Sequence, residues 1–317
     1  MPGDLTIGVD IGGTKVAAAL VSNTGDIAHK VRTRMNGAGT AEEGFGAVTR
    51  AIQSILADVP EARASLRGIG LCSPVPLDPK TGIVLNPPNL PCWRNFPLAA
   101  ETERTFGVPA RVDNDANAAG LAEALWGSGV GFSNVFYATL GTGIGSGIVF
   151  DRKIYHGRTG SAAEGGHVTI DYNGPKCGCG KPGCIEALAS GPAIAKRAQI
   201  RLAAGVSSRM LELAGAADNV SPEHVGRAFA EGDPVAREIL EETADLLTVW
   251  LGNIVDLIEP DVIVVGGGLA QLMSCFFPAM SRNLPRWAIN QRAGEIPLVM
   301  ARYGADAGIA GAAALCR

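Results

Sequence analysis

The chain has 317 residues, a formal net charge of -4, 47% hydrophobic residues and 18% charged residues. This length accommodates two domains, and the composition is that of a globular protein and not of a disordered one. The net charge gives no basic field for nucleic acid, and no uninterrupted apolar run is long enough to cross a bilayer. No signal-peptide pattern opens the chain, so we expect a cytoplasmic protein.

The first part of the chain predicts a mixed sheet covered by helices. Apolar residues at helical spacing predict a helix over 42–58, and a buried strand follows near 68–71. This alternation is typical of an α/β fold. Three apolar runs separated by turns predict three antiparallel strands before that helix, at residues 5–10, 16–21 and 27–33.

The opening strand-turn-strand pattern recurs about 130 residues later. Residues 135–139 and 148–150 predict strands, and the Gly-rich segment 140–147 between them predicts a turn. Two such units suggest a duplicated fold whose Gly-rich turns face each other across a cleft. Turns of this kind present backbone N–H groups to phosphate oxygens. Neither turn is a P-loop, because G-x-x-x-x-G-K-[ST] occurs nowhere in the chain.

A cysteine-rich segment over 164–186 predicts a structural zinc site. One imidazole and three thiolates complete a tetrahedral shell, and we expect the metal to fix Glu164 and Glu186 at the two ends of the segment. The other possibilities are unrelated thiols or a disulfide, which would be strained across a single glycine. The G-x-G-x-x-G pattern at 178–183 has no strand before it, so it does not indicate a dinucleotide site. The predicted ligands follow the order H-x9-C-x-C-x4-C: His167, Cys177, Cys179 and Cys184.

The remainder of the chain is predicted to be mainly helical. A buried strand at 261–265 runs into three glycines, 266–268, where an adenosine or phosphate can lie against backbone, although such glycines can equally serve tight packing. Small apolar residues predict a last helix over 306–315. The longest predicted helix carries an apolar stripe that indicates core: Val235, Ile239, Leu246, Leu247, Trp250, Ile254 and Leu257. The helices are predicted over 192–204, 221–231 and 233–259.

Five motifs in sequence order resemble the ROK family of sugar kinases and repressors, within the actin-like and hexokinase-like group. The resemblance implies an α/β fold of two ribonuclease-H-like domains flanking an active-site cleft, with a zinc-binding loop at 164–186. It also implies a smaller domain of residues 1–118 completed by a C-terminal helix at 305–317, and a larger domain of residues 119–304. The motifs are D-I-G-G-T-K at 10–15, N-P-P-N-L-P-C-W at 86–93, V-D-N-D-A-N at 112–117, L-G-T-G-I-G-S-G at 140–147 and the segment 164–193.

The resemblance implies phosphorylation of a hexose at its 6-hydroxyl by ATP with Mg²⁺, with glucose as the first candidate. Asp115 matches the catalytic base, and its alternative role is to cap the following helix. Asp10 matches a residue that orients magnesium or its water, and its alternative role is to cap the Gly-rich turn. The implied sugar-binding residues are Asn89, Asn114, Asp115, Glu164, His167 and Glu186. The implied ATP-binding residues are Asp10, Gly12, Gly13, Thr14, Lys15, Gly141, Thr142, Gly143, Gly266, Gly267 and Gly268.

Several residues depart from the family pattern and bear on the shape of the sugar pocket. Cys92, Ser146 and Ala163 stand where the family has glycine, and residues 73–76 depart from its Pro-Gly step. The alternative substrates are N-acetylmannosamine, N-acetylglucosamine, fructose and allose. A repressor would need a DNA-binding domain before Asp10, for which nine residues leave no room, and intact phosphate loops argue against a non-catalytic sensor. We expect a homodimer or homotetramer.

Overall fold

The computed structural model describes residues 4–317, and the chain divides into two compact units. Each unit contains helices and sheet strands, which confirms the mixed α/β class. This division into compact units does not test the domain boundary that is expected at residue 118. That boundary stays a prediction. No helix within residues 4–317 is both long and apolar enough to span a membrane. Of the described residues, the first unit contains 4–137, 147–163 and 301–317, and the second contains 138–146 and 164–300.

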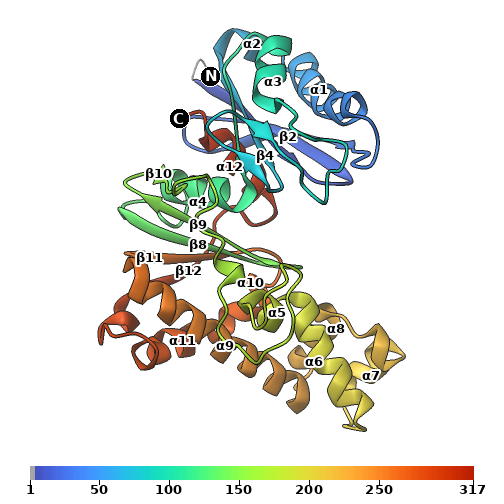
Figure 1. Ribbon diagram of the computed structural model, residues 1–317, viewed down its shortest axis with the longest axis vertical. Coiled ribbons are helices and arrows are strands. Elements are labelled where there is room, and N and C mark those ends of the chain that lie inside the picture. Colours follow the sequence, from blue (N-terminus) through green and yellow to red (C-terminus); the bar gives the residue numbers. More distant parts are fainter. Residues whose placement is uncertain (1–3) are drawn as a thin grey trace. The chain divides into compact units, whose positions relative to one another are not determined.

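The first unit is built on a five-stranded sheet with the order β3-β2-β1-β4-β7. Figure 1 labels its β2 and β4 strands. The β1, β2 and β3 strands pair antiparallel, as the sequence predicts, whereas β1, β4 and β7 run parallel. Parallel strands end at the same edge of a sheet, so the residues that follow β1, β4 and β7 lie near one another. The strands are β1 (Leu5–Ile11), β2 (Lys15–Val21), β3 (Ile27–Arg34), β4 (Leu66–Ser73) and β7 (Ala110–Asn114).

Helices cover both faces of this sheet, because successive side chains of a strand point to opposite faces. In β2, Val16 and Leu20 join a core with α1, whereas Ala19 and Val21 pack with Ile309 of α12. The α12 helix also contacts α4 (Figure 1). The smaller elements are β5 (Leu77–Asp78), β6 (Ile83–Val84), α2 (Ala62–Ser65) and η6 (Gly304–Asp306). The longer helices are α1 (Ala41–Asp58), α3 (Leu98–Phe106), α4 (Asp115–Trp126) and α12 (Ala307–Ala314).

Close approach of α12 to the sheet depends on a missing side chain in β4. A Cβ atom added at Gly70 would lie 1.6 Å from the carbonyl oxygen of Ala312. No side chain fits in that space, so glycine allows the helix backbone to rest directly on the strand. This packing holds α12 against the strand that ends beside the candidate site.

A second five-stranded sheet has the order β10-β9-β8-β11-β12. The β8 and β9 strands continue from one compact unit into the other, and β11 pairs parallel with β12. The predicted turn at 140–147 is too long, because β9 already begins at Ile144 and only residues 141–143 form the turn. The strands are β8 (Asn134–Leu140), β9 (Ile144–Phe150), β10 (Lys153–Ile154), β11 (Val262–Gly266) and β12 (Leu298–Met300).

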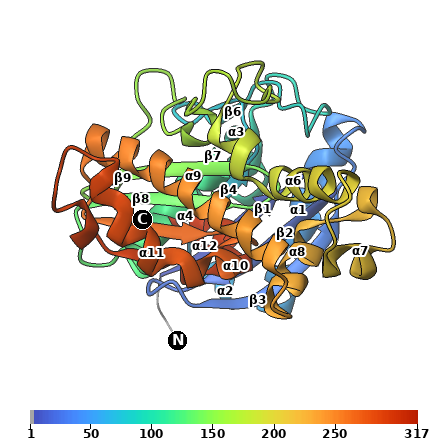
Figure 2. The same cartoon turned by 90° about the horizontal axis from the view of Figure 1, so that it is seen from below.

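The long α9 helix of the second unit contacts α5, α6, α8 and α11. Figure 2 shows α6, α8 and α11 beside it. Most of the predicted apolar stripe of α9 is buried, but Leu246 is only partly buried and Leu257 is 75% exposed, so the stripe is narrower and shorter than predicted. The 3-10 helices are η1 (Gly165–His167), η2 (Ala217–Asn219), η3 (Ser274–Phe276), η4 (Leu284–Arg286) and η5 (Ala293–Glu295). The α-helices are α5 (Ile185–Ala189), α6 (Gly191–Ala203), α7 (Arg209–Ala214), α8 (Pro222–Ala230), α9 (Pro234–Ile258), α10 (Ala270–Met273) and α11 (Phe277–Asn283).

Candidate functional site

Acidic residues gather where the parallel strands of the first unit end. Asp10 pairs in register with Cys72, and Cys72 pairs with Asp113 on the far side of β4. The chain leaves β7 through Asn114 and enters α4 at Asp115. The topology therefore brings Asp10 and the V-D-N-D-A-N motif to one edge of the sheet, although about 100 residues separate them in sequence.

The cap of α4 is Asn114, so the alternative role considered for Asp115 belongs to its neighbour. The Asn114 side-chain oxygen accepts hydrogen bonds from the backbone N–H groups of Ala116 and Asn117, and its amide donates to Asp115 Oδ1 over 2.9 Å. Asp115 Oδ1 also accepts the Ala116 N–H over 2.8 Å. Within residues 4–317, no hydrogen bond engages Oδ2 of Asp115, which leaves that oxygen available to a ligand.

Two carboxyl groups at this edge have raised pKa values. Desolvation raises the pKa of Asp115, even though its surface is open to solvent, because the surrounding protein replaces much of its water. Burial and the nearby Asp115 charge raise the pKa of Asp10 to about 6, and Lys15 opposes this shift. A carboxyl group with a raised pKa accepts a proton more readily, which suits one of this pair to general-base work.

The first Gly-rich turn lies against the loop that carries Asn89. Gly12 N–H donates to the Lys15 carbonyl over 2.9 Å, and Gly37 N–H donates to the Gly13 carbonyl over 3.1 Å. The next contact is Cys92 N–H to the Gly37 carbonyl, over 2.9 Å. Residue 37 thus joins the predicted phosphate turn to the predicted sugar-contact loop. Asn89, Thr14 and Lys15 are all exposed.

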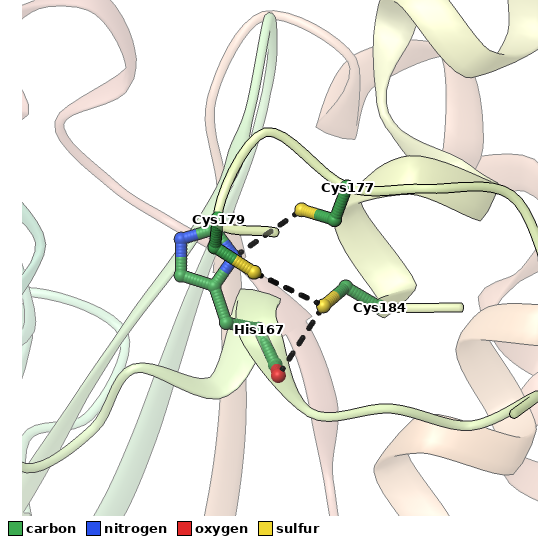
Figure 3. A group of neighbouring side chains, drawn as sticks. All are labelled: His167, Cys177, Cys179 and Cys184. Carbon is green, nitrogen blue, oxygen red and sulfur yellow. Dashed lines mark hydrogen bonds between the residues drawn. The ribbon is translucent and has the colours of Figure 1, made fainter. Parts of the chain in front are cut away.

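The four predicted zinc ligands come together in the second unit (Figure 3). His167 lies at the end of η1, Cys184 immediately precedes α5, and the other two cysteines lie between them. Their ligand atoms all lie within 4.8 Å of one another. Two thiols are buried, whereas Cys179 is exposed. The structure therefore places in one cluster all four residues that the spacing singled out.

The cluster geometry fits a tetrahedral metal. Cys179 Sγ lies 3.6 Å from Cys184 Sγ, and Cys177 Sγ lies 3.6 Å from His167 Nδ1. Four ligands around zinc, with Zn–S bonds of about 2.3 Å, place sulfur atoms roughly 3.7 Å apart. The other ring nitrogen of His167 points away from the three sulfur atoms (Figure 3). Desolvation and the neighbouring thiols raise the pKa of Cys184 to about 12, so a bound cation would displace its proton.

Glu186 connects this cluster to the second Gly-rich turn. Its Oε1 lies 3.7 Å from Cys177 Sγ and 3.9 Å from His167 Nδ1, whereas its Oε2 accepts the Ile144 N–H over 3.0 Å. Glu186 lies in the first turn of α5, and Glu164 immediately precedes η1. Glu186 thus lies on a helix beside the cluster, and the expectation that a bound metal fixes both carboxylates stays a prediction.

The two Gly-rich segments of the second unit also meet. Leu269 N–H donates to the Leu140 carbonyl over 2.9 Å, and Gly191 N–H donates to the Gly141 carbonyl over 2.8 Å. Gly267 has a φ of 88°, which a residue with a side chain rarely adopts, and a Cβ there would meet the Leu140 backbone. The predicted ATP-binding residues at 141–143 and 266–268 are thus neighbours.

Comparison with known proteins relates this arrangement to a family. The sequence model of the ROK family matches residues 6–317. A glucokinase from Thermotoga maritima is 34% identical over 317 residues, covering 100% of this chain and 98% of that protein. A glucokinase from Streptomyces coelicolor is 36% identical over 321 residues, covering 99% and 98%. The chain belongs to the ROK family.

A solved structure supports the same relationship. The ROK family glucokinase from Streptomyces griseus in complex with glucose and AMPPNP has a TM-score of 0.80 and 35% sequence identity, over 98% of each chain. These relatives show that this ROK chain is a glucokinase-like sugar kinase, a phosphotransferase.

Two of the residues expected to depart from the ROK pattern, Ser146 and Cys92, make structural contacts. Ser146 Oγ accepts the Gly165 N–H over 3.0 Å, so its hydroxyl supports the turn between Glu164 and His167. Ala163 has a φ of 64°, a left-handed backbone conformation that strains a residue with a side chain. The glycine expected at this position in the family would adopt it without strain. A Cβ added at Gly44 of α1 would lie 3.1 Å from Cys92 Sγ, so that thiol fills space against the helix.

Sequence reasoning missed one residue of this ROK site. His156 contacts Asp113 from 43 residues further along the chain, with His156 Nε2 lying 2.5 Å from Asp113 Oδ2. No spacing pattern links the two residues, and the only local signal is that His156 is one of four histidines in the sequence.

Proposed function

We propose that this ROK sugar kinase transfers the terminal phosphoryl group of ATP to the 6-hydroxyl of glucose. The observation that carries the proposal is the arrangement at Asp115. One carboxylate oxygen is held by Asn114 and by the N-terminus of α4, while the other is available to a ligand. An anchored carboxylate with a raised pKa and one available oxygen is suited to accept the proton of an attacking hydroxyl.

The hexose ring is assigned to side chains that combine donors and acceptors. Asn114 keeps a second amide N–H beyond the one given to Asp115, and the outward ring nitrogen of His167 adds another polar group. Glu164 and Glu186 supply acceptors, and Asn89 supplies both kinds of group. A site of this type rejects a wrong epimer because one of its polar groups would lose its partner.

The phosphates of ATP are assigned to the Gly-rich turns. Each turn is three residues long, 12–14 and 141–143, and exposes backbone to solvent. Lys15 adds a positive charge beside the first turn. The Asp10 carboxylate lies next to that turn and is a hard oxygen ligand, as Mg²⁺ or its bound water requires. Magnesium bound with ATP would neutralise charge that develops on the phosphates.

The zinc cluster is assigned a structural role. Four protein ligands fill a tetrahedral shell, so no position remains for substrate. Because Glu186 touches both this cluster and the Ile144 N–H, a bound zinc ion would keep that carboxylate oriented. No step of the reaction passes through the zinc ion.

The proposal is tested by measuring ADP release for a panel of sugars at saturating Mg-ATP. The panel contains glucose, mannose, fructose, N-acetylglucosamine and N-acetylmannosamine. We expect glucose to have the highest kcat/KM, and an epimer to be poorer by roughly ten- to hundredfold, since an unpaired buried polar group costs about 1–3 kcal/mol. Coupling to an oxidation specific for hexose 6-phosphate identifies the position of transfer.

Two results would change the assignment. If an acetylated sugar has a higher kcat/KM than glucose, the glucose assignment is wrong and the kinase assignment stands. If no sugar in the panel, nor allose, stimulates ADP release, the kinase proposal itself is wrong. A repressor or sensor would bind a sugar, detectable by calorimetry, without consuming ATP.

A further inference from the structure

The carboxylate of Asp113 is buried, with 3% of the residue exposed, and is fully engaged by its neighbours. Its Oδ1 accepts the Asn114 backbone N–H over 2.7 Å and the Asn117 side-chain amide over 3.2 Å. Its Oδ2 lies 2.5 Å from His156 Nε2. A buried carboxylate is stable only when it is paired and hydrogen-bonded, so this set of partners stabilises the charge.

The partners of Asp113 lie on both sides of Asp115. Asn114 precedes the proposed base and caps α4, while Asn117 follows it in the first turn of the helix. The Asn117 side-chain oxygen is buried and has no hydrogen-bond partner within residues 4–317. The orientation of that amide therefore depends on the bond from its nitrogen to Asp113. Asp113 thus holds the backbone of Asn114, which precedes Asp115, and the side chain of Asn117, which follows it.

His156 ties this arrangement to a different part of the first unit. The residue follows β10, which pairs antiparallel with β9, and its carbonyl accepts the Ala162 N–H over 3.2 Å. The imidazole is 30% exposed at the side chain, whereas the Asp113 side chain is 5% exposed. The loop after β10 therefore places the His156 imidazole against the Asp113 carboxylate. Asp113 lies two residues before the proposed base, and the imidazole is positively charged when it is protonated.

We propose that His156 and Asp113 form a positioning pair that holds Asp115 in its reactive orientation. The proposal rests on the proposed function, because it takes Asp115 to be the base. His156 touches neither substrate nor the reacting atoms, and it acts through the Asp113 carboxylate. It is a positioning residue and not a catalytic one.

Protonation strengthens the pair. The bond to Asp113 raises the pKa of His156, while burial and the Lys80 ammonium oppose the rise. Asp113 and Lys80 are the charged groups that face the ring. His156 carries its positive charge below its raised pKa, and the contact with Asp113 becomes a neutral hydrogen bond as pH rises through that pKa. Turnover should then decline on the alkaline side as Asp115 loses its fixed orientation.

The test uses His156→Ala, His156→Gln and Asp113→Asn in the full-length protein with its metals. We expect His156→Ala to lower kcat on the order of tenfold to hundredfold, the scale of a small misplacement of a reactive group. The KM for ATP should stay within about twofold of the wild-type value. His156→Gln keeps a neutral donor at every pH, so its turnover should lie above that of His156→Ala, match the wild type only on the alkaline side, and lack the alkaline decline. The double variant His156→Ala/Asp113→Asn should be no slower than the slower single variant, because the two residues act as one unit.

Controls separate positioning from general damage. Tyr155→Ala changes the adjacent residue of the same loop, whose ring is half exposed and packs near Phe150, and should leave the pH profile unchanged. If His156→Ala lowers turnover only in proportion to the fraction of unfolded protein, the pair is structural and the proposal is wrong. If His156→Ala does not fold, an unchanged pH profile in His156→Gln overturns the proposal on its own.

Parallel measurement of Asp115→Asn distinguishes the two proposals. A slow Asp115→Asn together with normal His156 variants refutes the positioning pair and leaves the proposed function intact. Near-normal turnover of Asp115→Asn refutes the assignment of the base, and with it the reason for the pair.

Discussion

Glu186 Oε2 accepts the backbone N–H of Ile144 over 3.0 Å, while the other oxygen of the same carboxylate lies 3.7 Å from Cys177 Sγ. One side chain therefore joins the cysteine cluster to the strand that follows the second Gly-rich turn. Ile144 and Glu186 are 42 residues apart in sequence. If a hexose hydroxyl also binds this carboxylate, then Glu186 contacts the metal cluster, the strand after the phosphate turn and the sugar.

The substitution Glu186→Gln tests that anchor. An amide oxygen still accepts the Ile144 N–H, but the negative charge that favours a hydroxyl donor is lost. We expect the KM for the hexose to rise roughly tenfold or more, and the zinc content to remain at one ion per chain, because Glu186 is not among the four predicted ligands. Steady-state kinetics and elemental analysis measure the two effects.

The control is Glu241→Gln, which changes an exposed glutamate of α9 in the same unit. Its kinetics should match those of the wild-type enzyme. An unchanged hexose KM in Glu186→Gln would remove Glu186 from the sugar site and leave it with a structural role.

Loss of one metal ligand should disorder the cysteine cluster. Purified protein is expected to contain one zinc ion per chain, and Cys179→Ser should lose it, since three remaining ligands bind zinc far more weakly than four. Because Cys179 is exposed, the change removes a ligand without disturbing the core. Elemental analysis gives the zinc content, and thermal unfolding should show a lower midpoint together with weaker hexose binding.

The matched control is Cys275→Ser, which alters an exposed cysteine outside the cluster. Zinc content and hexose affinity should not change in that variant. A wild-type protein without stoichiometric zinc, prepared without chelators, would contradict the assignment of the cluster.

Local patterns in the sequence predicted the parts of the site that local chemistry determines. Strand alternation and turn glycines predicted β1, β2 and β3, and ligand spacing predicted the cluster of His167 with three cysteines. The long apolar stripe predicted most of α9. In each case the physical cause lies within a few tens of residues, so the sequence displays it.

Contacts between distant segments could not be predicted in the same way. The bond between His156 and Asp113 depends on the loop after β10 returning to the end of β7, which no spacing encodes. Ser146 looked like a departure from a glycine, and its bond to the Gly165 N–H is visible only once β9 and η1 are placed. The second Gly-rich turn is shorter than predicted because residues 144–147, the second half of the predicted turn, belong to the β9 strand.

Asp10 should make folding stability depend on pH. Its pKa is raised to about 6 in the folded protein, above the value of about 4 expected for an unfolded chain, so ionisation disfavours the folded state. The penalty is absent below about pH 4, grows as pH rises, and is complete above about pH 6. Asp10→Asn should therefore raise stability at pH 8 by on the order of 2 kcal/mol, with a smaller gain at pH 5.

Urea unfolding of both proteins at pH 5 and pH 8, without added magnesium, measures this difference. Asp58→Asn, at the exposed end of α1, is the control for the loss of one carboxylate. Equal gains for Asp10→Asn at both pH values would show that the carboxyl titrates normally. The same variant should lose activity, since Asp10 is assigned to the magnesium ion or its water.

Asp115→Asn should separate substrate binding from chemistry. The amide keeps the size of the carboxyl group, and its oxygen can still accept the Ala116 N–H, so the start of α4 should be preserved. The group that takes the proton of the sugar hydroxyl is lost. We expect kcat to fall by at least about 10²-fold, the usual scale for removal of a general base, while the Kd of the hexose changes by less than about fivefold.

Calorimetry gives the Kd, and single-turnover measurement with Mg-ATP gives the rate of transfer without interference from product release. Asp58→Asn, at the exposed end of α1, is the control for a change of charge in the first unit and should behave as the wild-type enzyme. Near-normal turnover of Asp115→Asn would mean that the hydroxyl loses its proton elsewhere. Catalysis would then rest on positioning by the two Gly-rich turns and on charge stabilisation along the phosphates, and the raised pKa of Asp115 would reflect only its desolvation by the surrounding protein.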